Sequence, residues 1–278
     1  MGAAKQYLSV CALYKDHAAY LREWIEFHRL VGADRFFLYD NESTDEHEEV
    51  LLPYVELGIV EVHDWPSPPS VRQNKYWGLR GAFDDCLARH RDDSRWIAFL
   101  DVDEFLFSPT GRTLPDVLRG FEQFSGVEVS RFDFGPSGHR TKPSGLVIES
   151  YLRRRPYTSP EHDLEQVKSV VDPTRVERTL NAHGFYYKDG YAVHEDGERA
   201  YGEFPGSKTF PQTSLLRINH YITKSVEEYM TKRVQWAAAG LARRPPTAPF
   251  IELLSGEQDE AITVYVPALR DALAKPVG

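Results

Sequence analysis

Strand-like and helix-like segments alternate along the first part of the chain, and this order restricts the fold more than any other feature. Short apolar runs are separated by segments in which apolar residues recur at helical spacing. Parallel strands need a crossover, usually a helix, so the order predicts a Rossmann-like, mostly parallel sheet with helices on both faces. The expected strands are residues 7–14, 35–39, 58–63 and 96–100, and the expected helices are residues 17–31, 46–55 and 71–90.

The pattern changes after Asp103. Short extended segments alternate with glycine and proline turns, and helical spacing returns in a few places. We therefore expect an α/β fold whose second half is irregular and mixed. The expected extended segments are residues 127–134, 146–151, 167–171, 185–187 and 215–218, the expected helices are residues 114–124, 226–241 and 259–273, and residues 243–249 are the expected linker.

Composition narrows the function classes. The formal net charge of −9 argues against nucleic acid as a partner, because nucleic acids select basic surfaces. No segment is long and apolar enough to span a bilayer, and residues 1–6 carry no apolar leader, so we expect a cytoplasmic protein. Cys11 and Cys86 lie in apolar segments without zinc-site spacing, which favours two buried, reduced thiols.

The main chemical motif is Asp101-Val102-Asp103, which directly follows an apolar strand-like run. In open parallel sheets, ligands bind beyond the carboxyl ends of the strands. Side chains alternate along a strand, so we expect Asp101 and Asp103 to project to the same side. Two carboxylates there can hold Mg²⁺ or Mn²⁺ while water and a diphosphate complete the coordination. A solvated acidic loop is the alternative, and the position at a strand end favours the metal site.

A second polar group, residues 39–45, follows the second predicted strand. Asp40, Asn41 and Asp45 are expected at the same edge of the sheet, where they can hydrogen-bond a base and a ribose. The alternative is an Asx turn followed by the cap of the next helix, with Ser43 or Asp45 as the cap. Beside the acidic motif, the two interpretations are about equally supported.

A third group, residues 219–225, lies late in the chain. His220 is a suitable third ligand for Mn²⁺, and Lys224 can neutralise a leaving diphosphate. Because a strand is expected before this group and a helix from Val226, residues 220–225 should form the connecting turn. The alternative is a hydrogen-bonded structural histidine beside a solvated lysine.

Together these segments resemble glycosyltransferase family 92, which is related to the family 2 glycosyltransferases with the GT-A fold. The matching segments occur in the family's order and span most of the chain between Tyr20 and Lys232. They are YLREWI (20–25) with His28 and Gly32, YDN (39–41) with Ser43 and Asp45, WIAFLDVDEF (96–105), FGPSGH (134–139), KSVV (168–171), and NHY (219–221) with Lys224 and Ser225.

The resemblance implies a GT-A glycosyltransferase that uses a nucleotide-sugar donor, UDP-galactose by the family's example, and inverts the anomeric carbon. It implies Mn²⁺ or Mg²⁺ at Asp103, with Asp101 near the ribose or the metal, and His220 completes our predicted ligand set. The expected acceptor is a hydroxyl group of a glycan or a small molecule. The expected donor-binding residues are Leu13, Tyr14, Asp40, Asn41, Asp45, Gln73, Asp101, Val102, Lys168 and Lys224.

We expect one domain, because no obvious flexible linker separates the two halves. Residues of about 6–108 should form the nucleotide-sugar-binding half, residues of about 109–242 the acceptor half, and residues of about 243–278 a linker with a C-terminal helix.

Sugar transfer passes through an oxocarbenium-like transition state, so the acceptor hydroxyl needs a general base. If the first half holds the donor, the base comes from the second half. We rank Asp133 first because it ends a predicted strand beside the glycine-containing turn at residues 134–138, although a turn-capping role explains it equally well. The candidates are Asp133, His139, His194 and Glu195.

Two other function classes remain as alternatives. A metal-dependent phosphate-ester hydrolase can also use an Asp-x-Asp motif, but its nucleophilic aspartate normally follows the first strand, and here residues 13–15 carry no paired carboxylates. A non-catalytic carbohydrate-binding module needs aromatic side chains but no apparatus for a metal and a diphosphate.

Overall fold

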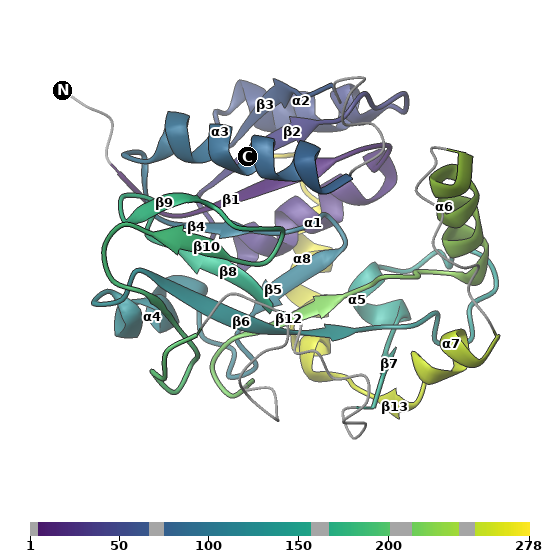
Figure 1. The fold of residues 1–278 in the computed structure, drawn as a ribbon. Helices are drawn as coiled ribbons and strands as arrows, with labels where there is room; N and C mark the ends of the chain where they lie inside the picture. Colours follow the sequence, from purple (N-terminus) through teal and green to yellow (C-terminus); the bar gives the residue numbers. More distant parts are fainter. Residues whose placement is uncertain (1–4, 67–74, 157–166, 201–212, 239–247) are drawn as a thin grey trace.

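The computed structural model describes residues 5–66, 75–156, 167–200, 213–238 and 248–278 (Figure 1). Its main sheet has the strand order β3-β2-β1-β4-β8-β6-β12-β5, with β11 paired to β6. These strands are β1 (Gln6–Tyr14), β2 (Arg35–Asp40), β3 (Val60–Asp64), β4 (Ser94–Phe99), β5 (Glu104–Phe107), β6 (Gly126–Asp133), β8 (Val167–Val171), β11 (Ala192–Val193) and β12 (Arg217–His220).

Helices and short strand pairs lie around this sheet. Two small antiparallel pairs, β9 with β10 and β7 with β13, lie outside it. The remaining elements are α1 (Ala18–Leu30), α2 (His47–Glu56), α3 (Lys75–His90), α4 (Leu114–Leu118), η1 (Arg119–Phe121), α5 (Val147–Ser150), β7 (Arg153–Arg154), β9 (Val176–Thr179), β10 (Phe185–Tyr187), α6 (Val226–Ala238), α7 (Ala248–Leu253), β13 (Glu257–Gln258), η2 (Ala261–Tyr265) and α8 (Val266–Leu273).

Strand β1 shows why the sheet is covered on both faces. Its side chains alternate, so Leu8, Val10 and Ala12 join the hydrophobic core that includes the buried residues of α1. Cys11 faces the other way, into the core beneath α3. Figure 1 shows α3 in front of the sheet and α1 and α8 behind it. The predicted α/β architecture with a mostly parallel sheet is therefore confirmed.

Strand direction decides where the polar strand ends gather. β3, β2, β1 and β4 are mutually parallel, and β8 is antiparallel to both β4 and β6. β6 therefore runs in the direction of β4, and β12 is parallel to β6. The carboxyl ends of β1 to β4, β6 and β12 consequently lie along one edge of the sheet, and α6 stands beside this edge (Figure 1).

Several sequence-based boundaries are wrong. Residues 146–151 were expected to be extended, but residues 147–150 form the helix α5. The helix expected over residues 114–124 divides into α4 and η1, and the terminal helix divides into η2 and α8. The strand β5 was not predicted, and the strand expected at residues 215–218 begins at Arg217 and ends at His220. Residues 71–74 and 243–247 lie outside the described residues.

Candidate active site at the carboxyl edge of the sheet

Asp101 and Asp103 lie in a tight turn between β4 and β5. β4 ends at Phe99, and the N–H of Glu104 donates to the carbonyl oxygen of Asp101 at 3.0 Å. The prediction that the two aspartates alternate along a strand is therefore wrong. The turn sends the two carboxylates to different partners, Asp101 towards β8 and Asp103 towards β12.

Asp101 belongs to a buried network of ion pairs. The Nζ atom of Lys168, on β8, lies 2.9 Å from Asp101 Oδ2 and 3.2 Å from Glu104 Oε2. Arg131, on β6, donates to Glu104 Oε1 at 2.7 Å. Lys168 is only 1% exposed and Glu104 is fully buried, whereas about a third of the Asp101 side chain, 34%, is exposed. The buried members of the network therefore hold the turn in place, and the Asp101 side chain stays partly exposed at the carboxyl edge of the sheet.

Asp103 forms the second part of the site with His220 and Asp133. The Nε2 atom of His220 lies 3.5 Å from Asp103 Oδ1, and the Nδ1 atom lies 2.6 Å from Asp133 Oδ1. The N–H of Tyr221 donates to the carbonyl oxygen of Asp103 at 2.8 Å and holds the two segments together. His220 is the last residue of β12, so the prediction that it begins a connecting turn is wrong.

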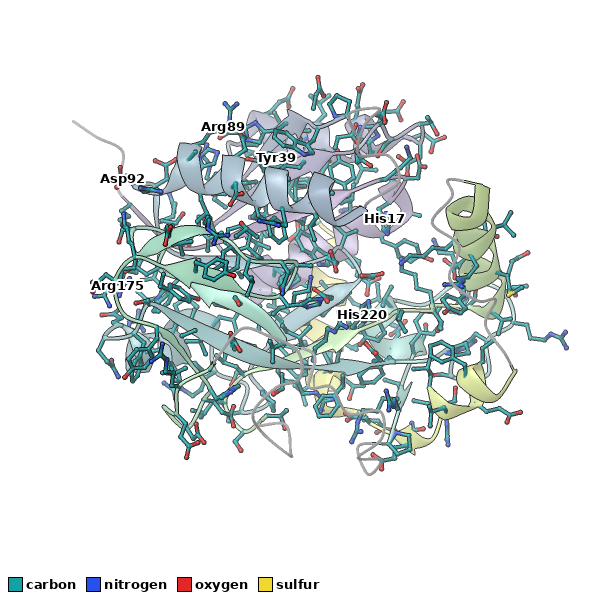
Figure 2. All side chains as sticks on the ribbon, viewed as in Figure 1. His17, Tyr39, Arg89, Asp92, Arg175 and His220 are labelled. Atoms are coloured by element: carbon teal, nitrogen blue, oxygen red, sulfur yellow. The ribbon has the colours of Figure 1, made fainter. Side chains whose placement is uncertain are left out.

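Two lysine side chains lie near this triad, on the side of α6. Lys232, on α6, donates to Asp103 Oδ2 at 3.0 Å. The Nζ atom of the buried Lys224 lies 3.9 Å from the centre of the Tyr20 ring. His17 faces the same group of charges, and Figure 2 shows His17 and His220 on the side of the sheet next to α6. Three separate parts of the chain, around residues 17, 103 and 220–232, thus converge here.

The charges set the protonation states of the triad. Burial alone would raise the pKa of Asp103, but Lys232 and His220 hold it well below its ordinary value. Burial also opposes ionisation of Asp133, yet Arg131 and His220 bring its pKa to about 2. Burial lowers the pKa of His220, and the two carboxylates outweigh that effect and raise it. Burial lowers the pKa of Lys224 to about 8.

The donor set of Asp103 and His220 fits a divalent cation. Two donor atoms that bind one ion at about 2.1 Å lie about 3.0–3.4 Å apart. The observed separation of His220 Nε2 and Asp103 Oδ1, 3.5 Å, is close to that range. Asp133 at Nδ1 is the carboxylate partner that a metal-binding imidazole usually has, because it orients the ring and directs Nε2 towards the ion. Asp101 pairs with Lys168 instead, so the structure does not assemble the predicted three-ligand set of Asp101, Asp103 and His220.

The ends of β1 and β2 place the predicted nucleotide-binding residues along the same edge. Asn41 donates from Nδ2 to the carbonyl oxygen of Trp65 at 2.8 Å, and Asp40 Oδ1 accepts from the N–H of Ser43 at 3.1 Å. Asp45 Oδ2 accepts from the N–H of Ala18, the first residue of α1, at 2.7 Å, and Asp45 Oδ1 lies 3.2 Å from Nδ1 of His47, the first residue of α2. These side chains therefore hold the loop together, and the alternative expectation that Ser43 or Asp45 caps the next helix is wrong, because the start of α2 has no side-chain cap.

The other donor candidates divide between buried and edge positions. Leu13 and Tyr14 end β1, and the hydroxyl of Tyr14 is buried without a hydrogen-bond partner among the described residues. Val102 is buried inside the turn between β4 and β5. Gln73 lies outside the described residues.

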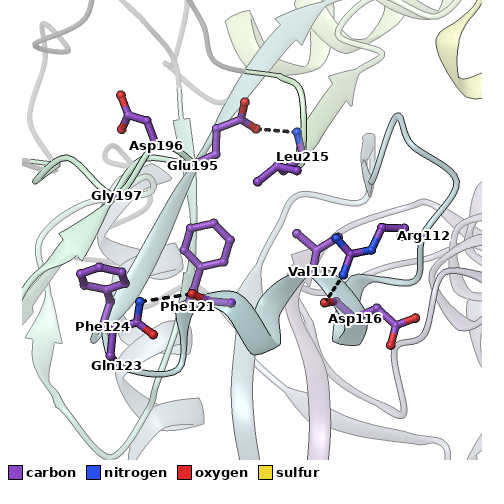
Figure 3. Close-up of a pocket in the computed structure, with 11 residues that line it drawn as sticks. Arg112, Asp116, Val117, Phe121, Gln123, Phe124, Glu195, Asp196, Gly197 and Leu215 are labelled. Carbon is purple, nitrogen blue, oxygen red and sulfur yellow. Dashed lines mark hydrogen bonds between the residues drawn. The ribbon is translucent and has the colours of Figure 1, made fainter.

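Three of the four candidate bases, Asp133, His139 and Glu195, occupy different places. Asp133 is engaged by His220, and His139 lies beside the start of α6 with Nε2 3.0 Å from the carbonyl oxygen of Ser150. Glu195 accepts the N–H groups of Ser214 and Leu215 at 2.7 and 2.8 Å. It belongs to a surface pocket beside α4 (Figure 3). The structure does not bring Glu195 to the triad.

The position of Glu195 follows from the direction of β12. The hydrogen bond to Leu215 lies before the first residue of this strand, whereas His220 is its last residue. Five residues of a strand span about 16 Å. His194, beside Glu195, is likewise buried away from the triad, in the segment after β11.

Sequence reasoning missed several members of the site. Glu104 and Arg131 join the ion-pair network, and Lys232 reaches Asp103 from α6. The exposed Lys142 places its Nζ 4.2 Å from the centre of the same Tyr20 ring that Lys224 contacts. Only Glu104 had a local signal, as the third carboxylate of the acidic motif.

The described residues include no helix with the length and apolar character needed to cross a membrane.

Comparison with known proteins places the sequence among sugar-transfer proteins. Residues 6–199 match the family described as glycosyltransferase family 92. A family 92 protein of Oryza sativa subsp. japonica is 33% identical over 220 residues, which cover 77% of this chain and 33% of the relative. A galactan beta-1,4-galactosyltransferase of Arabidopsis thaliana is 35% identical over 119 residues, 40% of this chain and 22% of the relative. The chain thus spans about a third of the length of the family 92 relatives it matches.

Solved structures are more distant. A structure of TarS from S. aureus in complex with UDP has 10% identity and a TM-score of 0.41, over 98% of this chain and 76% of that chain. Glucosyl-3-phosphoglycerate synthase from Mycobacterium tuberculosis, in complex with Mn²⁺ and UDP, has 20% identity and a TM-score of 0.31, over 47% of this chain and 45% of that chain. Similarity at this level assigns no function.

Proposed function

The chain belongs to glycosyltransferase family 92, and from this membership we propose that it is a metal-dependent glycosyltransferase. We propose that it transfers a hexose, galactose in the first instance, from a UDP-sugar to a hydroxyl acceptor with inversion. Galactose is supported by the partial similarity to galactan beta-1,4-galactosyltransferases. The motif at the strand ends supports a metal-bound diphosphate, and UDP is the nucleotide that the family resemblance implies. The acceptor is a hydroxyl of a glycan or a small molecule.

The observation that carries the proposal is the pairing of Asp103 with His220 at the carboxyl edge. Asp103 supplies a carboxylate whose low pKa keeps it ionised, and His220 supplies an imidazole oriented by Asp133. These residues would hold Mn²⁺ or Mg²⁺, which as a Lewis acid offsets charge on a leaving diphosphate. The edge of a parallel sheet is where nucleotides bind in folds of this class.

The lysines have separate roles in this proposal. Lys168 forms ion pairs with both Asp101 and Glu104. In this proposal it therefore positions Asp101 and does not itself contact the nucleotide-sugar. Lys224 and Lys232 stand on the α6 side of Asp103, where cations favour a departing diphosphate. The first N–H groups of α6 donate to the carbonyl oxygens of His139 and Arg140, so the two lysines, and not the helix terminus, supply the positive charge.

Asp133 acts in this proposal through His220 and not as the general base. Its Oδ1 atom is committed to the imidazole at 2.6 Å, and its pKa of about 2 makes it a weak proton acceptor. A base must reach the acceptor hydroxyl with an available atom. We therefore treat Asp133 as a positioning residue, and its substitution should change metal affinity before it changes the chemical step.

A thermal-shift experiment tests the proposal. UDP and Mn²⁺ together should raise the melting temperature of the chain more than UDP alone or Mn²⁺ alone. The reason is that ligands that bind the folded state stabilise it. Asp103→Asn should remove the Mn²⁺-dependent part of this shift and abolish sugar transfer while the chain still folds, although its unliganded melting temperature should fall because Lys232 and His220 lose their counter-charge. Asp116→Asn, at an exposed carboxylate on α4, is the matched control.

Activity assays and the thermal-shift experiment together separate the alternatives. Cleavage of a phosphate ester without sugar transfer would support a hydrolase, and thermal stabilisation by free sugar without UDP would support a binding module. Parental activity of Asp103→Asn at saturating Mn²⁺ would exclude the metal assignment. A screen of UDP-, GDP- and TDP-sugars for donor hydrolysis then identifies the nucleotide and the sugar.

A further inference from the structure

Three metal-binding side chains meet where β3 packs beneath the C-terminal end of α3. Glu61 and His63 are two residues apart on β3 and therefore project to the same face, and His90 is the last residue of α3. Glu61 Oε1 lies 3.4 Å from His63 Nε2 and 3.6 Å from His90 Nε2. One ligand atom from each side chain lies within 4.8 Å of the other two.

The two imidazoles are aimed at this point without hydrogen-bond partners there. Both Nε2 atoms are buried and make no hydrogen bond to any of the residues that the structure describes. His90 is 5% exposed, so its ring is removed from solvent. A buried polar atom that lacks a partner destabilises the folded state. Two such atoms converging on one carboxylate oxygen form a set of metal ligands.

Neighbouring groups orient each ligand. Asp93 Oδ2 lies 2.8 Å from His90 Nδ1, which puts the proton on Nδ1 and leaves the lone pair of Nε2 facing the cluster. Arg35 donates to Glu61 Oε2 at 2.7 Å, which leaves Oε1 for the cluster. The His90 ring stacks on Phe37 with ring centres 3.7 Å apart, and the His63 ring stacks on Tyr39 at 4.8 Å.

From this geometry we propose that Glu61, His63 and His90 form a second cation site, which binds Zn²⁺ with water as the fourth ligand. Two imidazoles and one carboxylate suit Zn²⁺ better than Mg²⁺ or Ca²⁺, which prefer oxygen ligands. Ligand atoms at about 2.05 Å from a tetrahedral ion lie about 3.3 Å apart, close to the two observed separations. Glu61 is 35% exposed, which provides a path for the ion.

The zinc site is separate from the proposed transfer site. Glu61 pairs with Phe37, three positions before the pair of Asp40 and Asp64 at the carboxyl edge. Figure 2 shows Arg89 and Asp92, which flank His90 in sequence, on the other side of the view from His17 and His220. Zn²⁺ here would join the outer strand of the sheet to α3, so its role is to stabilise this part of the fold.

Zinc titration of the metal-stripped chain tests the site. We compare the parent with Glu61→Gln, His63→Gln and His90→Gln, and we use Glu56→Gln, at an exposed carboxylate of α2, as the matched control. Competition with a chromogenic chelator should show one more equivalent of bound Zn²⁺ in the parent and in Glu56→Gln than in the three ligand variants. Asp93→Asn should bind the same equivalent about 10–100-fold more weakly.

The difference between variants is diagnostic, because any ion at Asp103 and His220 is common to all of them. Zn²⁺ should raise the melting temperature of the parent more than that of the ligand variants, and the Mn²⁺-dependent UDP shift should stay the same in all. Equal zinc stoichiometry in the parent and in the ligand variants would overturn the site, whatever the outcome for sugar transfer. If a histidine variant does not fold, the partly exposed Glu61→Gln decides the question.

Discussion

Asp133 provides the sharpest test of the site because it touches the histidine and not the expected ion. Asp133→Asn keeps the size of the side chain but removes the charge that orients His220 and supports its basicity. We expect Mn²⁺ affinity to fall by about 10–100-fold, with activity restored at high Mn²⁺. His220→Ala should lose the ligand itself, so that added Mn²⁺ restores activity less completely.

A titration of activity against Mn²⁺ measures both effects. If Asp133→Asn instead lowers turnover at saturating Mn²⁺ and leaves the metal dependence unchanged, Asp133 is the general base and our assignment as a positioning residue is wrong. If both variants match the parent in metal dependence, His220 is structural.

Lys224 can be tested against a lysine in nearly the same place. Lys224 is buried and Lys142 is exposed, yet both ammonium groups lie over the Tyr20 ring. Lys224→Ala should weaken UDP binding by the value of a charge-assisted contact, about 1.5–3 kcal/mol, and should also reduce turnover. Lys142→Ala should change UDP affinity much less, because water screens the exposed charge.

Calorimetric titration with UDP in the presence of Mn²⁺ distinguishes the two lysines. Equal losses in both variants would mean that the two ammonium groups contribute alike and that burial gives Lys224 no special role. No loss in either variant would make the segment after His220 purely structural.

The sequence predicted these side chains better than their connections. Asp101 and Asp103 were proposed because a motif at a strand end has a chemical meaning, and His220 was proposed because an imidazole is a suitable Mn²⁺ ligand. The pairing of Asp101 with Lys168 depends on β8 lying between β4 and β6, and nothing local to either residue encodes that order. The ligand role of Asp103 was reached from a strand alternation that the turn does not have.

Secondary structure was predictable where a long periodic segment decides it. The strands and helices up to β4 have the expected order, because each is long enough for its apolar pattern to dominate. α5 is four residues long, and its start is fixed by carboxylates, with Glu149 accepting from the N–H of Leu146 and Glu23 from the N–H of Val147. A local cap by Glu149 and a tertiary contact from Glu23 thus make a helix of a segment whose apolar pattern indicated a strand.

The start of α6 matters to the site because this helix carries Lys232. Ser225 and Glu228 form a capping box: Ser225 Oγ accepts from the N–H of Glu228 at 3.3 Å, and Glu228 Oε2 accepts from the N–H of Ser225 at 3.1 Å. Ser225→Ala should cost about 1 kcal/mol, or about 2–4 °C in melting temperature. It should also weaken the Mn²⁺-dependent UDP shift, because Lys232 is then held less firmly.

Thr231→Ala on the same helix is the control. Its Oγ1 donates to the carbonyl oxygen of Glu227 at 3.0 Å from an exposed position, so the change should stay within about 0.5 kcal/mol. Thermal unfolding of both variants measures the difference. Equal melting temperatures would show that the contacts of α6 with the sheet edge, and not its cap, hold the helix.

For the molecule as a whole, the sequence determined the class of fold but not the order of the strands. Alternating strands and helices made a parallel sheet the expectation, and β1 to β4 realise it. Later strands extend the same sheet, with β8 inserted between β4 and β6 in the opposite direction. Antiparallel insertion lets β6 and β12 end at the same edge as β4, which is why residues from both halves of the chain meet at Asp103.

The stability of the whole fold should depend on pH through a histidine in the core between α1 and β5. His28 is fully buried, its Nδ1 lies 2.8 Å from the carbonyl oxygen of Trp24, and its Nε2 accepts from the N–H of Leu106 at 3.2 Å. This arrangement requires the neutral ring. Burial lowers the pKa of His28 from 6.5 to about 4.

The unfolded chain therefore binds a proton more readily than the folded chain does between these two values. The stabilisation from His28 should be complete above pH 6.5 and should be lost as the pH falls towards about 4. A pKa shift of this size corresponds to a contribution from His28 to the free energy of unfolding on the order of 3 kcal/mol. Denaturant unfolding at a series of pH values measures it. His28→Gln, whose amide can make both hydrogen bonds without titrating, should show a correspondingly flatter pH dependence than the parent. Parallel curves for the two proteins would mean that His28 does not control acid sensitivity.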